Sequence, residues 1–272
     1  MHRAILAMIL LLAGAGAGSG QTPPSPAEEA ALVSAWKVHL AATNDHPKVV
    51  SACQEFRKKS PASQFGVVAD GLAAWHLLQA NEPAAATNLL EKMLGLGQTD
   101  QIGKAGMTMA RRWLTRLDRE RVKLALKQLY RKDIEFPPSL EAMRGLPAAQ
   151  RGPFTDRWGQ TWSYRLTEFK SPNLKNLRGQ RYELQSAMLR ADSDLAEALK
   201  RPYAAKINLK AVKLISASPG KEAVEFVTTD EKQQKTVLTV GTDVGGVTFL
   251  FLGSGLLILS DGDSWAVLPK AK

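Results

Sequence analysis

The chain has 272 residues, 44% of them apolar, and a formal charge of +10 at neutral pH. This length allows two or three modest domains with buried cores. The single cysteine excludes an internal disulfide framework and a cysteine-rich zinc site. We expect Cys53 to be a small buried apolar residue, with a free reactive or intermolecular thiol as the alternative.

The positive charge is concentrated in one region of the chain. From Lys104 to Lys213 there are 24 Lys and Arg against 11 Asp and Glu, whereas the rest has 12 against 15. Such a field favours an acidic partner: a protein face, anionic lipid headgroups or nucleic acid.

Residues Met1–Gly20 have the pattern of a signal peptide: a short polar or charged start, an apolar core and a run of small residues. The core, Ala4–Ala13, is shorter than the roughly 20 residues that a transmembrane helix needs, although an uncleaved anchor is the alternative. Gln21–Pro26 is a Pro-rich linker. We therefore expect a periplasmic protein without a transmembrane span in its mature chain, which argues against a nucleic-acid partner.

Residues 27–100 are predicted to form helical hairpins. The sequence Ala35-Trp36-Lys37-Val38 is echoed by Ala74-Trp75-His76-Leu77, and each copy is followed by a polar turn with a proline and a further helix. These second helices are expected over Lys48–Lys58 and Ala84–Leu96. The two hairpins resemble tetratricopeptide-like repeats, which implies paired helices that pack on whatever follows them.

Two histidines belong to this repeat. His39 and His76 lie at different offsets from the repeated Trp, so their spacing predicts no pair of metal ligands. We interpret both as helix-surface residues or satisfied core residues.

A long basic helix is predicted over Thr108–Lys132, after a glycine-containing stretch, Gly95–Gly106, that is expected to end the helical array. Its apolar residues form two stripes displaced by about one residue: Met107, Ala110, Leu114 and Leu117, then Val122, Leu126, Leu129 and Tyr130. The shift indicates either a bend or a helix that is contacted on two sides. Its charged residues form either a solvated face or a docking face for an acidic partner.

The segment after this helix begins with a helix stop. Pro137 and Pro138 are expected to end the helix at Ile134 or Glu135. Ser139 is then expected to cap a short helix.

A tight turn and two strands follow. Asp156-Arg157-Trp158-Gly159 has the chemistry of a turn, because the carboxylate accepts backbone N–H groups and glycine permits a positive φ. Alternating residues around Tyr164 and Tyr182 indicate two half-buried strands, joined by a hairpin loop over Lys170–Gly179.

This ordered set of motifs resembles the globular domain of the type II secretion major pseudopilin, general secretion pathway protein G. The resemblance covers about Met107 to Asp194 and implies a long helix with a small antiparallel sheet. The chain lacks the prepilin start of that family, so we do not expect it to be processed or to polymerise as a pilin. We interpret the matching residues as fold-specifying: Pro137, Pro138, Asp156, Trp158, Gly159, Tyr164 and Tyr182.

Members of that family can bind calcium in the loop after the second strand. The resemblance places Ser186, Asp192 and Asp194 in that neighbourhood, but Ala187-Met188-Leu189-Arg190 replaces the family's Gly-x-Asp-Gly context. Two carboxylates beside an arginine are few for a calcium site. We therefore expect these acids to cap a helix that includes Leu195–Lys200, and we assign no metal and no cofactor.

Beyond a short helix over Asp192–Ala205, residues 205–270 are predicted to form a small all-β barrel or sandwich. Turn signals separate six candidate strands: Ile207–Ile215, Ala223–Thr229, Lys235–Val240, Val247–Leu252, Gly255–Ser260 and Ser264–Leu268. Val247–Leu252 is strongly apolar at the positions that point to either face of the predicted strand. It is therefore expected to be either a central strand or an edge strand covered by a partner.

This segment resembles the periplasmic domain shared by pilus assembly protein P and general secretion pathway protein C. The features that carry the resemblance are, in order, Ala223-Val224, Val237-Leu238-Thr239-Val240-Gly241-Thr242, Val247-Thr248-Phe249-Leu250 and the closing strands Gly255–Ser260 and Ala266–Pro269. It implies binding to secretin channels or to inner-membrane partners.

Together these features predict an α+β multidomain fold: signal peptide (1–20), linker (21–26), helical hairpins (27–100), a pseudopilin-like helix and sheet (105–200) and a small β domain (205–270). No His-Glu-x-x-His, Gly-x-Ser-x-Gly or Walker motif occurs, so we expect a non-enzymatic protein. The resemblances imply a scaffold or accessory component of type II secretion or type IV pilus machinery, with a secretin, pseudopilin or assembly-platform protein as partner. The alternative is a general periplasmic module that docks anionic lipid or polysaccharide through its basic central region.

Overall fold

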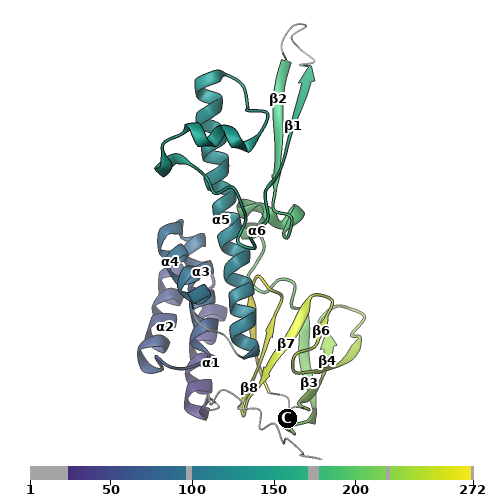
Figure 1. The fold of residues 1–272 in the computed structure, drawn as a ribbon. Coiled ribbons are helices and arrows are strands. Elements are labelled where there is room, and N and C mark those ends of the chain that lie inside the picture. The colour runs from purple at the N-terminus through teal and green to yellow at the C-terminus, as the bar shows by residue number, and fades with distance from the viewer. Residues whose placement is uncertain (1–23, 96–99, 171–177, 219–220, 271–272) are drawn as a thin grey trace, which may run out of the picture.

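The structure, a computed structural model, describes residues 24–95, 100–170, 178–218 and 221–270 (Figure 1). The predicted signal peptide and residues 21–23 of the linker lie outside the described residues, as do residues 171–177 of the predicted hairpin loop. Within these ranges, helices dominate the N-terminal part and antiparallel strands the C-terminal part, which confirms the α+β class. No helix in the described ranges combines the length and apolarity needed to cross a membrane.

The predicted helical hairpins are present. They consist of α1 (Pro26–Ala41) with α2 (His46–Lys59) and α3 (Gly66–Gln79) with α4 (Pro83–Gly95), standing side by side in Figure 1. The first helix starts with a capping box, in which Glu28 N donates to Ser25 Oγ (3.3 Å) and Ser25 N donates to Glu28 Oε2 (2.8 Å).

The long helix α5 (Gln101–Asp133) starts earlier than predicted. Asp100 caps it by accepting Gly103 N at 2.8 Å, so part of the stretch expected to end the array is helical. Gly106 serves close packing here, because a Cβ at this position would lie 2.0 Å from Val67 Cγ1 of α3. The other end agrees with the prediction, since Ile134 is the left-handed C-cap (φ 61°) just before the two prolines.

Helix α5 is contacted on two sides. Its lower half buries Ile102, Met109 and Trp113 in the main core, whereas its upper half buries Val122 and Leu126 in a second, smaller core. The shift between the two apolar stripes of the sequence therefore corresponds to a change of buried face.

The second core is closed by the segment after α5. Two 3₁₀ turns, η1 (Leu140–Gly145) and η2 (Ala148–Gln150), lead to the antiparallel strands β1 (Ser163–Lys170) and β2 (Arg178–Gln185). The expectation that Ser139 caps a helix is wrong, because its side chain makes no capping hydrogen bond. The fully buried side chain of Met143 anchors this 3₁₀ segment instead.

The predicted helix over Asp192–Ala205 is shorter than expected. It consists of the 3₁₀ turn η3 (Arg190–Ser193) and α6 (Leu195–Lys200). Pro202 follows closely and disfavours helical backbone at the residue before it.

All six predicted C-terminal strands form, and they build two antiparallel sheets. One sheet contains β3 (Leu209–Ser216), β4 (Ala223–Thr228) and β5 (Lys235–Thr239); the other contains the unpredicted β6 (Asp243–Val244), β7 (Val247–Leu252), β8 (Leu256–Ser260) and β9 (Trp265–Pro269). The barrel alternative is wrong, because in the described residues β9 pairs only with β8 and does not close onto β3. Strand β7 lies between β6 and β8, as the central-strand alternative predicted.

One core joins the helical hairpins to the C-terminal sheets. The ring of Phe65 contacts that of Phe251 at a centroid distance of 5.2 Å, and Trp265 is fully buried in the same cluster. The buried carboxylate of Glu29 in α1 accepts hydrogen bonds from Ser254 N (2.9 Å) and Gly255 N (2.8 Å). Residues 27–100 and 205–270, which lie far apart in the sequence, therefore pack as one body.

Candidate functional site

The turn at Asp156 closes the second core. Its Oδ1 accepts hydrogen bonds from Trp158 N (2.9 Å) and Gln160 N (3.0 Å), and Gly159 has a φ of +78°. The carboxylate also reaches the end of β2, where Ser186 Oγ donates to Oδ2 at 2.6 Å. Ser186 Oγ in turn accepts from Leu189 N at 3.2 Å. This acid therefore links the turn, β2 and the loop that leads to η3.

The remaining motif residues tie the strands to the end of α5. Tyr164 Oη donates to the carbonyl of Pro137 at 2.7 Å, and the rings of Phe136 and Tyr182 pack edge to face at 4.8 Å. Pro138 follows in the same connection. Burial raises the pKa of Tyr164 to about 12, so its hydroxyl keeps its proton and remains a donor. These contacts fix the backbone and place no reactive group in a cavity.

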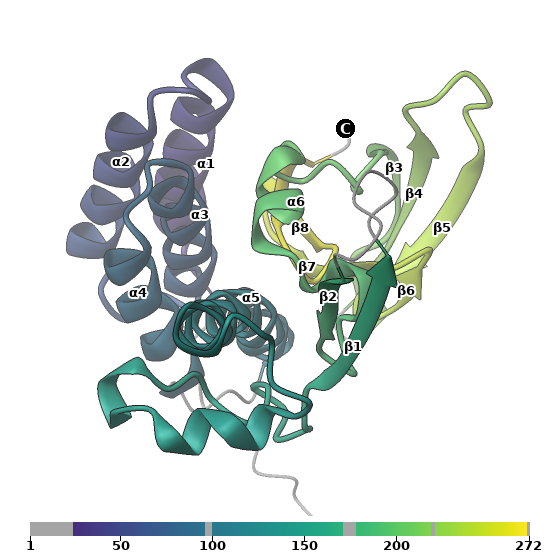
Figure 2. The ribbon, with the colours of Figure 1, turned by 90° about the horizontal axis from the view of Figure 1, so that it is seen from above.

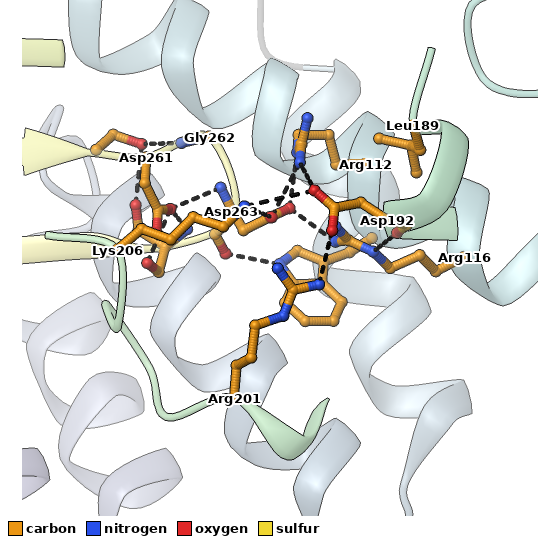
Figure 3. A network of polar contacts seen from close by, with 12 residues as sticks. Arg112, Arg116, Leu189, Asp192, Arg201, Lys206, Asp261, Gly262 and Asp263 are labelled. Atoms are coloured by element: carbon orange, nitrogen blue, oxygen red, sulfur yellow. Dashed lines mark hydrogen bonds and ion pairs between the residues drawn. The ribbon is translucent and has the colours of Figure 1, made fainter. Parts of the chain in front are cut away.

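An ion-pair cluster around Asp263 lies where α5, η3, the segment after α6 and the β8–β9 turn meet (Figure 3). Arg112 makes a two-point contact with this carboxylate, with Nε–Oδ1 and Nη2–Oδ2 distances of 2.7 and 3.0 Å, and Arg116 Nη1 donates to Oδ1 at 2.7 Å. Burial alone would raise the pKa of Asp263, but the two guanidinium groups hold it well below its usual range.

The guanidinium of Arg116 is fully buried in this cluster. It lies 4.6 Å from the ring centroid of Trp113, and its Nε donates to the carbonyl of Asp192 at 2.9 Å. Trp113 Nε1 donates to the carbonyl of Asp263 at 2.8 Å. Nε and Nη1 thus donate to a carbonyl and a carboxylate, whereas Nη2 is buried with no hydrogen-bond partner among the described residues. We interpret this buried charge as a structural clamp.

Asp192 and Asp194, which the resemblance placed near a calcium-binding loop, pair with basic side chains. Asp192 accepts from Arg201 at 3.0 Å and pairs with Lys206 at 3.5 Å, and Asp194 accepts from Arg119 Nη1 at 2.7 Å. Asp194 also accepts Glu197 N at 3.1 Å, which confirms the predicted capping of α6. Among the residues described, no group of three or more His, Cys, Asp or Glu is arranged to hold a metal ion.

A chain of three imidazoles was not expected from the sequence. His39 Nδ1 lies 3.0 Å from His76 Nε2, and His76 Nδ1 lies 2.9 Å from His46 Nδ1. A neutral His76 donates at one ring nitrogen and accepts at the other, so all three rings can be linked without a charge. The satisfied-core interpretation of His39 and His76 therefore holds.

Burial disfavours a positive charge on His39 and His76. It lowers the pKa of His39 to about 4, and together with the charges of the two neighbouring rings it lowers that of His76 to about 3. The rings of Trp75 and Tyr203 also pack against His39, at centroid distances of 6.5 and 5.3 Å. The signal in the sequence was the repeat itself, since equivalent helices of stacked hairpins are neighbours.

Two hollows lie near these clusters. A groove of about 420 Å³ runs along α2 and α4, and its lining includes His46, Val50, Gln54, Leu77, Glu82 and Leu89. A cavity of about 30 Å³ lies beside Trp75, Tyr203 and Asp263, which is room for about one water molecule. Cys53 contributes no reactive thiol to either, because it is buried and its pKa is raised to about 12.

The described residues thus include the Asp263 and histidine clusters, which hold elements together, and an open groove along α2 and α4. No family model, curated protein or solved structure matches this chain.

Proposed function

We propose that this chain is a non-enzymatic, exported scaffold or accessory component of type II secretion or type IV pilus machinery, acting through protein–protein contacts. The proposal combines the two resemblances in the sequence, to general secretion pathway protein G and to the shared domain of proteins P and C. Its expected partners are a secretin, a pseudopilin or an assembly-platform protein.

The observation that carries the proposal is the buried ion-pair cluster of Arg116 and Asp263. It ties α5 and the β8–β9 turn together directly, and through the carbonyl of Asp192 it reaches η3, the turn that follows β2. Elements joined in this way present their outer faces at fixed relative positions. Fixed spacing between binding faces is what a scaffold requires, because two linked partners are then held at a defined distance.

Affinity purification of the tagged full-length chain from crosslinked envelope extracts tests the proposal. We expect recovery of at least one secretin, pseudopilin or assembly-platform protein. An Asp263→Asn variant, which loosens the cluster, should recover less, whereas a variant of an exposed acid on β1, Glu168→Gln, should behave as wild type. Recovery of none of these proteins by the wild type would refute the proposal.

The alternative function, docking to anionic lipid or polysaccharide, is favoured by one observation. Lys127, Arg131 and Lys132 are exposed and form no ion pair with any residue that the structure describes. Cosedimentation with anionic vesicles or an acidic glycan that weakens steeply with salt would support this alternative.

A further inference from the structure

The upper half of α5 exposes a face that combines apolar and basic side chains. Leu124 is 60% exposed on this face, and Lys127 and Arg131 lie on adjacent turns of the same face. Ile134, at the end of the helix, is 72% exposed. We call the strip of Leu124, Lys127 and Arg131 the shelf face. Covering Leu124 or Ile134 with a partner would remove apolar surface from water.

The shelf face continues a face that is buried lower on the same helix. Leu124, Lys127 and Arg131 lie about five helical turns above Gly106, Met109 and Trp113, respectively, and therefore point in the same direction. Gly106 packs against Val67 and Met109 against Gly71, both of α3. Trp113 packs toward the β8–β9 turn through its bond to the carbonyl of Asp263. The array of α1–α4 therefore projects from α5 on the side to which the shelf face points.

The upper half of α5 buries a different side. Val122, Leu126 and Leu129 pack there against Met143 and Trp162. Viewed along the helix, the segment that contains η1 lies on one side of α5 and the array of α1–α4 on the other (Figure 2). The shelf face and the array below it thus form a step: the exposed side of α5 is its vertical surface, and the upper end of the α1–α4 array is its horizontal surface.

The two cations of the shelf face, Lys127 and Arg131, have no ion-pair partner among the described residues. By contrast, Lys123 is paired with Glu120 at 2.8 Å and Arg121 with Asp118 at 3.2 Å. An occupant that places carboxylates opposite Lys127 and Arg131 gains complementary charges, and one that covers Leu124 removes apolar surface from water.

We propose that the shelf face docks an acidic amphipathic helix of a protein partner. A helix of about 10 Å diameter can lie in the step along α5, with apolar residues on Leu124 and acids on the two cations. The array of α1–α4 projects from the same side of α5, which favours a narrow partner such as a single helix over a flat bilayer at these cations. This inference rests on the proposed scaffold role and names the chemistry of one partner.

The test uses the full-length mature protein and a labelled synthetic helical peptide about four turns long, with Leu on one face and Glu on the other. Fluorescence anisotropy should show binding that weakens with salt, and hydrogen exchange should slow at residues 121–134. A Lys127→Glu/Arg131→Glu variant should bind at least about tenfold more weakly. A Lys104→Glu/Arg111→Glu variant changes the net charge equally at exposed positions of the lower half and should bind as wild type.

The inference would be overturned if both charge-reversal variants bound the peptide equally well, or if a Lys-substituted peptide bound as well as the Glu peptide. It would also be overturned if binding to anionic vesicles required Lys127 and Arg131 while binding of the peptide did not. Circular dichroism on each variant separates loss of binding from loss of fold. If wild type and the Lys127→Glu/Arg131→Glu variant recover the same envelope proteins in the affinity purification, the docking role of the shelf face is refuted while the scaffold role stands.

Discussion

Arg116 and Asp263 form a buried ion pair of 2.7 Å between the middle of α5 and the β8–β9 turn. The Arg116 side chain is 0% exposed and that of Asp263 is 13% exposed. Each charge is thus balanced inside the protein, and the pair holds two regions that are far apart in the sequence.

Removing the acid should therefore destabilise the whole protein. An Asp263→Ala substitution leaves Arg112 and Arg116 without their shared carboxylate, and breaking such a buried pair costs about 3–5 kcal/mol. Urea unfolding at pH 7 followed by circular dichroism measures this loss. Glu168→Ala, at an exposed position of β1, is the control and should change the stability by less than about 0.5 kcal/mol. A stable Asp263→Ala variant would show that the cluster does not hold the fold together.

The histidine chain predicts a loss of stability in mild acid. In the folded protein the pKa of His39 is about 4 and that of His76 about 3, both below the ordinary value of 6.5. At a pH between the folded and the ordinary value, each histidine therefore binds more protons in the unfolded chain than in the folded protein. The free energy of unfolding should therefore be unaffected above pH 6.5 and should fall as the pH drops from 6.5 toward 4. At pH 5 the expected loss is about 1–2 kcal/mol for each histidine.

Thermal unfolding across this pH range, compared with a His39→Gln variant, measures the contribution. The variant should lose less stability between pH 7 and 5 than wild type. Asp263 acts in a different pH range. Its lowered folded pKa stabilises the protein at neutral pH, and this contribution is lost only as the pH falls below the unfolded value of 3.8. An identical pH profile in the His39→Gln variant would contradict the assignment.

The Asp156 turn should act on stability rather than directly on binding. Asp156→Ala removes the acceptor of Trp158 N, Gln160 N and Ser186 Oγ, and we expect a loss of about 2–3 kcal/mol. Trp158→Ala should also lower stability. A double-mutant cycle of Asp156→Ala with Ser186→Ala should give a coupling of about 1 kcal/mol or more in chemical denaturation. A fully stable Asp156→Ala variant that has lost partner binding would refute the structural role.

Gly106 tests the close approach of α5 and α3. Alanine is normally the better helix former, but here its Cβ would lie 2.0 Å from Val67 Cγ1. Gly106→Ala should therefore destabilise the protein by about 1–3 kcal/mol, and adding Val67→Ala should recover part of that loss relative to the sum of the single changes. Denaturant midpoints of the four proteins measure the effect; additive changes would indicate that the helices do not touch here.

The sequence by itself determined the local structure. The prolines after Ile134, the turn at Asp156 and the alternation around Tyr182 each depend on residues a few positions apart, and each element formed where it was predicted. The α+β class follows from these local patterns, because periodicity distinguishes helix from strand.

Only the tertiary structure decided which elements meet. His39 and His76 are 37 residues apart and are related in the sequence only by the repeat of their helices. Arg116 and Asp263 are 147 residues apart, and no pattern in the sequence relates them. The same holds for α5, whose two apolar stripes indicated a change of face but not what covers each half. The shelf face exists because the array of α1–α4 ends below Leu124, and where a neighbouring element ends is a property of packing rather than of local sequence.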